Sequence, residues 1–155
     1  MISALRLCLV VLGLGALFGQ AIYVPVAASQ STETYPELAY LAVPYALALI
    51  VVLACVQAVL VAIFKLLAMV EEGWIFNPRA VRWVDVIIVS AAVATVVTVG
   101  VATHLVNVVG VGGPFALVVQ AGSLVAGVSF VLLMVVMRGL LRSATVLQTE
   151  MAEVV

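Results

Sequence analysis

The chain alternates between four long apolar stretches and short polar connections. The apolar stretches cover about residues 5–26, 37–70, 78–108 and 114–142. Each provides the roughly 20 residues that a helix needs to cross the hydrocarbon core of a bilayer. We therefore predict an all-α integral membrane protein with a single membrane domain over residues 1–155. Because short connections place consecutive helices side by side, the expected fold is a four-transmembrane antiparallel helix bundle.

Two of these helices are predicted to outrun the bilayer. The second apolar pattern continues to Glu71 before a terminating Gly73, and the fourth continues into an amphipathic tail over residues 140–155. Asn77 and Pro78 supply the cap and first position of the third helix. Helices 2 and 4 are thus expected to extend beyond the membrane on the same side.

The tail carries a short heptad stripe of apolar residues. Its members repeat at alternating spacings of four and three: Leu140, Ala144, Leu147, Met151 and Val154. Two heptads are too short to be stable alone, so the stripe is expected to dock on something. The candidates are the overhang of the second helix, around Leu67 and Glu71, and a separate protein.

Composition and charge agree with a membrane protein. Hydrophobic residues make up 67% of the chain and charged residues 8%, against roughly 25% charged in ordinary globular domains. The net charge of −1 and the lack of a basic cluster argue against direct binding of nucleic acid. The expected surroundings are a lipid bilayer.

The basic residues predict the orientation of the chain. All six lie at or near connections on one predicted side: Arg6, Lys65, Arg79, Arg82, Arg138 and Arg142. Because Lys and Arg are retained in cytoplasmic loops, both termini are expected to be cytoplasmic. The first stretch could instead be read as a secretory signal, but its length favours a spanning helix.

Apart from Glu37, the first residue of the second stretch, Asp85 is the only carboxylate inside an apolar stretch. An ionisable group within a span is a functional candidate by default, because exposing its charge to lipid is costly. Asp85 lies close to the predicted inner interface, however, which favours an ion pair. Arg82, three residues earlier on the same helix, is the first expected partner, and Arg138 on the fourth helix is the second.

The uncharged polar residues in the spans are expected to form hydrogen bonds between helices. Lipid offers no partner to Gln20, Gln57 or Gln120. His104, near the outer end of the third span, is a candidate group for sensing external pH, since an unperturbed histidine titrates near pH 6.5. More often, a lone histidine simply caps an interface.

The sequence does not favour catalysis or cofactor binding. It has a single histidine and lacks the C-x-x-C, H-E-x-x-H and phosphate-loop patterns. Cys8 and Cys55 show no metal-ligand spacing and are expected to be reduced thiols. We therefore expect neither an enzyme, a metal site nor a cofactor.

Two segments carry a family resemblance: GWIFNPRAVRWVDVI, residues 73–87, and LLRSATVLQTEMAEVV, residues 140–155. They resemble the bacterial four-helix membrane proteins catalogued as domain of unknown function 2975, and the actinobacterial branch most closely. The likeness is expected to include all four spans, although many members end in a more acidic tail with an Asn-Asp pair. Members are often encoded beside a small helix-turn-helix regulator. The resemblance implies a regulatory membrane protein and assigns no functional residue.

Together these features predict a non-enzymatic protein that docks a cytoplasmic regulator or accessory partner through its inner hairpin and tail. One alternative is a small transporter or channel that works as a homo-oligomer, suggested by Asp85 and the glutamines in the spans. A subunit of a larger membrane complex is the other alternative.

Overall fold

The described part of the chain is helical throughout its long segments. A computed structural model describes residues 2–26, 29, 39–71, 78–110 and 113–153. The long helices are α1 (Ile2–Phe18), α3 (Ala39–Glu71), α4 (Pro78–His104) and α5 (Gly113–Glu153). Two π-helical segments, η1 (Gly19–Tyr23) and η3 (Leu105–Val109), continue α1 and α4. The predicted all-α class is confirmed for this part.

Four helical segments are long and apolar enough to cross a membrane. They cover Ala4–Val26, Ala39–Glu71, Arg79–Val109 and Leu117–Leu147 within the residues described. These segments match the four predicted spans to within a few residues at most ends. The protein therefore has the helix content of a multi-pass membrane protein.

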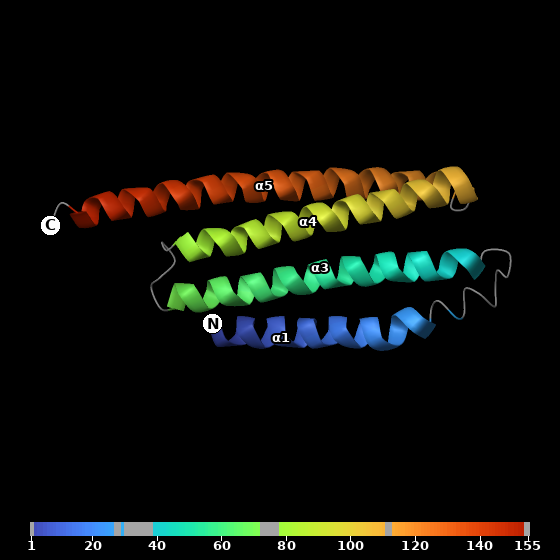
Figure 1. Ribbon diagram of the computed structural model, residues 1–155, viewed down its shortest axis with the longest axis horizontal. Coiled ribbons are helices and arrows are strands. Elements are labelled where there is room, and N and C mark those ends of the chain that lie inside the picture. The colour runs from blue at the N-terminus through green and yellow to red at the C-terminus, as the bar shows by residue number, and fades with distance from the viewer. Residues whose placement is uncertain (1, 27–28, 30–38, 72–77, 111–112, 154–155) are drawn as a thin grey trace.

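The helices lie in a row that follows the order of the chain. α1 packs on α3, α3 on α4 and α4 on α5, and among described residues no other pair of these helices makes more than a marginal contact. Figure 1 shows the helices in this order, with α1 at one edge of the view and α5 at the other. Each inner helix therefore has two helical neighbours, and each edge helix has one.

Side-chain contacts show how neighbouring helices are aligned. Arg6 pairs with Glu71, and Gln20 pairs with Gln57. From the first pair to the second, the residue number rises by 14 along α1 and η1 and falls by 14 along α3. In the same way Asp85 pairs with Arg138, and Thr103 with Gln120. Neighbouring helices thus run in opposite directions, as Figure 1 also shows.

The buried core is small and lies mainly between α3 and α4. Among described residues, the buried apolar side chains are Val24, Leu41, Ala62, Ala80, Val84 and Ile87. Ala62 and Ala80 are completely buried, and such small residues allow two helix backbones to approach closely. Most large apolar side chains on the four helices are exposed, as expected for surfaces that face lipid rather than water.

A glycine ends the third span. Gly110 has a φ of 70° and its N–H bonds to the carbonyl of Leu105, so it closes η3 in the left-handed conformation that suits glycine. α5 then begins at Gly113. The predicted signals at Gly73 and Asn77 lie outside the described residues.

One glycine on α5 is required by the contact with α4. A β-carbon at Gly127 would lie 2.9 Å from Cβ of Thr95, whereas one at Gly122 would meet nothing within 4 Å. Thr95 is itself held in place, because its hydroxyl donates a 2.8 Å hydrogen bond to the carbonyl of Ala91. The two helices therefore approach closely where Gly127 faces Thr95.

This contact predicts opposite effects of the same substitution at two positions of α5. Gly122→Ala is expected to leave stability unchanged or raise it, since alanine favours helix by up to about 1 kcal/mol. Gly127→Ala is expected to cost about 1–3 kcal/mol, because the added methyl group overpacks the interface. Thermal unfolding of the two detergent-solubilised variants measures the difference. Equal midpoints would contradict the close contact.

Candidate functional site

Polar side chains join neighbouring helices at both ends of the row and at one level between them. One end of the row contains Arg6, Glu71, Asp85 and Arg138, and we call it the charged end. The first turns of α1 and the last turns of α5 lie at this end (Figure 1). The other end contains Tyr45, Thr103, His104 and Gln120, and we call it the uncharged end.

At the charged end, Arg6 connects α1 to α3. Its guanidinium forms an ion pair with Glu71 and lies 5.6 Å from the centre of the Phe64 ring. About a third of each charged side chain remains exposed, 33% for Arg6 and 35% for Glu71. Sequence reasoning missed this pair, having used Arg6 only for orientation. The sequence could have predicted this pair, because Arg6 and Glu71 carry opposite charges and lie at the same end of consecutive spans.

Asp85 and Arg138 form the second ion pair of the charged end. Nη2 of Arg138 donates a 3.2 Å hydrogen bond to Oδ2 of Asp85. Nε of the same guanidinium lies against Oδ1 but is not aligned for a hydrogen bond. The guanidinium of Arg138 therefore contacts both carboxylate oxygens of Asp85. This arrangement fixes the relative orientation of the two side chains and neutralises their charges. The pair joins α4 to α5.

The structure reverses the expected order of partners for Asp85. Its ion pair is with Arg138, the second candidate, while Arg82 is exposed on α4. Within one helix, a basic residue that precedes an acidic one is the less favourable orientation, and Arg82 precedes Asp85. A guanidinium approaching from the neighbouring helix can meet both carboxylate oxygens without that constraint.

An amide chain connects η1 and α3 between the two ends. Gln57 donates a 3.0 Å hydrogen bond to the side-chain carbonyl of Gln20, and Gln20 donates a 3.1 Å bond to the backbone carbonyl of Ile50. Both glutamines thereby find protein partners in a region where lipid offers none. The bonds are between helices, as the sequence suggested for Gln57.

The uncharged end links three helices through consecutive residues of α4. The Tyr45 hydroxyl lies 2.7 Å from Nδ1 of His104, and the two rings meet edge to face at 6.0 Å. On the other side, Gln120 donates a 2.5 Å hydrogen bond to the Thr103 hydroxyl. His104 therefore has a specific partner on α3. Its proposed response to external pH stays a prediction.

The apolar stripe of the tail is largely uncovered. Leu140 is 63% exposed and Leu147 is 60% exposed, while Ala144 is half-buried. The side chain of Met151, and Val154 as a whole, lie outside the described residues. α5 makes at most a marginal contact with α3, so the overhang of α3 does not cover the stripe. This finding removes the intramolecular alternative for the described part of the tail.

The described residues contain no grouping suited to a metal ion. Three or more His, Cys, Asp or Glu side chains do not gather anywhere within the described ranges. Cys8 and Cys55 are both free, the former exposed and the latter half-buried. The chemical capacity of the described site is thus ion pairing and hydrogen bonding between helices.

The sequence of the chain matches a known protein family. The profile of a family described as "Protein of unknown function (DUF2975)" matches residues 26–155. The chain belongs to this family. The match begins after η1 and covers α3, α4 and α5. No curated protein and no solved structure matches the chain.

The pair between Asp85 and Arg138 can be tested by a double-mutant cycle. Asp85→Asn or Arg138→Gln alone is expected to cost about 1–3 kcal/mol, less than the roughly 3–5 kcal/mol of a fully buried pair, because both side chains are partly exposed. The double variant should cost less than the sum of the two. Unfolding in mixed micelles provides the free energies.

Arg82→Gln is the matched control for this cycle. It removes the same charge one turn from Asp85 but does not touch the ion pair described, so stability should change by no more than about 0.5 kcal/mol. Additive effects of Asp85→Asn and Arg138→Gln, or a loss with Arg82→Gln as large as with Arg138→Gln, would contradict this assignment.

Proposed function

We propose that this protein is a non-enzymatic, multi-pass bacterial inner-membrane protein that docks a regulatory or accessory partner. The partner would bind on the cytoplasmic side, at the tail of α5 and the connection between α3 and α4. The observation that supports this function is the extension of α5, with the exposed Leu147, past the start of α4.

The alignment of α4 and α5 gives the length of that extension. Arg138 faces Asp85, which lies seven residues after Pro78, the first residue of α4. α5 continues for 15 residues from Arg138 to Glu153. Roughly eight residues, or about 12 Å of helix, therefore project beyond the start of α4. Figure 1 shows α5 reaching beyond the other helices at this end.

The exposed stripe is the feature a partner would recognise. Leu140 and Leu147 lie two turns apart on one face of α5 and are mostly exposed. Both leucines lie in the last turns of the segment Leu117–Leu147, so the interaction surface that we propose begins where α5 leaves the membrane. A helix presenting such a stripe commonly packs against a groove or another helix of its partner.

The alternative of a transporter or channel receives less support. A single row of helices encloses no pathway among the described residues, so conduction would require several copies. Asp85, the best candidate for binding a cation, is occupied by Arg138. A role as a subunit of a larger complex agrees with the docking proposal, because the row leaves both edge helices open to neighbours.

The proposed orientation places both termini of the antiparallel bundle in the cytoplasm. In a variant with Cys8 and Cys55 replaced by serine, Ser31→Cys should react with a membrane-impermeant maleimide in intact spheroplasts. Ser143→Cys should react only after permeabilisation, because basic residues are retained on the cytoplasmic side. The opposite labelling pattern would invert the orientation.

The docking stripe can be tested by paired substitutions on the same helix. Leu140→Gln combined with Leu147→Gln should abolish co-purification of specific partners from detergent extracts, since docking through an amphipathic helix depends on its apolar anchors. Val146→Gln changes an equally apolar residue, 50% exposed, that lies off the stripe. It should leave the set of partners unchanged. An identical set with all variants would refute docking through this stripe.

A further inference from the structure

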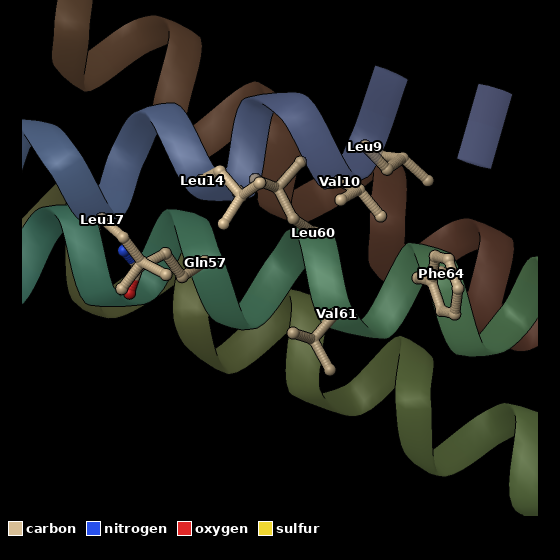
Figure 2. A pocket seen from close by; sticks show the side chains of 9 residues that line it. Leu9, Val10, Leu14, Leu17, Gln57, Leu60, Val61 and Phe64 are labelled. Carbon is tan, nitrogen blue, oxygen red and sulfur yellow. The ribbon is translucent and has the colours of Figure 1, made fainter. Parts of the chain in front are cut away.

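An apolar groove separates α1 from α3 between the charged end and the amide chain. It has a volume of about 400 Å³, within the roughly 300–1,000 Å³ of small-molecule sites. Leu9, Leu14 and Leu17 line it from α1, while Gln57 and Phe64 line it from α3 (Figure 2). The groove opens to the surroundings of the helix row, which in these spans is lipid.

The groove exists because α1 has a glycine where a side chain would fill it. Gly13 lines the groove, and a β-carbon built there would meet nothing within 4 Å. Contacts hold α1 to α3 on either side of this point, through Arg6 with Glu71 and through Gln20 with Gln57. The gap is therefore a fixed feature between two attachments.

The two ends of the groove differ in chemistry. Gln57 stands at the end nearer the middle of the span, where its amide is engaged with Gln20. Phe64 stands at the other end, with the guanidinium of Arg6 next to its ring. Arg6 thus places a guanidinium at this end of the groove.

We propose that this groove binds one acyl chain of a membrane phospholipid, whose phosphate lies at Arg6. The apolar walls suit a hydrocarbon chain, and the guanidinium of Arg6 at the interfacial end suits a phosphate. A guanidinium keeps several donors available beyond those used by one carboxylate. This inference goes beyond the docking function proposed above and does not depend on it.

The length of the groove suits one acyl chain of a single leaflet. From Leu9 to Leu17 the groove follows about 12 Å of helix, close to the roughly 15 Å depth of one leaflet.

Filling the groove provides the first test. The full chain is purified in detergent supplemented with a phospholipid, and bound lipid is counted by native mass spectrometry. Gly13→Leu should lower retained phospholipid by at least about threefold, because the leucine occupies the space of the chain. Gly15→Leu is the matched control: a β-carbon there also meets nothing within 4 Å, and Gly15 does not line the groove. It should retain phospholipid like the unsubstituted protein.

A second measurement requires no variant and so stands even if Gly13→Leu fails to fold. A phospholipid with a photoreactive acyl chain should crosslink residues 9–17 and 57–64 more than the equally apolar segment around Val125, which is 65% exposed on α5. Diacylglycerol with the same chains should compete poorly, because it lacks the phosphate.

Three results would overturn the proposal. They are equal retention by the Gly13→Leu and Gly15→Leu variants, uniform crosslinking along all lipid-facing helices, and equal competition by diacylglycerol. Loss of a dimer with Gly13→Leu, without loss of bound phospholipid, would identify a second copy as the occupant and would also overturn it.

Discussion

The register of this helix row depends on one constraint: hydrocarbon offers no hydrogen-bond partner to a polar side chain. An α-helix satisfies its own backbone, so the polar side chains in the spans must pair with a neighbouring helix. Arg6 with Glu71, and Asp85 with Arg138, do so at the charged end. Tyr45 with His104, and Gln120 with Thr103, do so at the uncharged end. Sliding any helix by one turn would separate these partners.

Apolar packing then determines how tightly each pair of helices is held. Lipid chains are as apolar as leucine, so contact depends on close fit rather than on exclusion of water. Ala62 and Ala80 allow a close fit between α3 and α4, and Gly127 allows one between α4 and α5. Between α1 and α3, Gly13 instead leaves a groove. Glycine thus allows close packing at one interface, where the Thr95 side chain faces it, and leaves space at another, where no side chain fills the gap.

The sequence predicts the spans well because hydropathy and helix-end signals are local properties. It ranks the partners of Asp85 wrongly, since proximity along one helix says nothing about the arginine that the next helix brings near. The pair between Arg6 and Glu71 was missed for the same reason: it depends on how α1 is aligned with α3. The groove at Gly13 depends on which face of α1 meets α3, and the weakly amphipathic apolar pattern of α1 does not specify that face.

The charged end is where these features meet the proposed docking surface. Leu140 and Leu147 follow Arg138 by two and nine residues, which is within three helical turns. A partner bound to this stripe would press on α5 close to the ion pair that fixes α5 against α4. Because α5 is an edge helix with only one helical neighbour, that ion pair is one of the contacts that hold it in the row. Docking on the tail would therefore act first on the position of α5 in the row, and through Asp85 on α4.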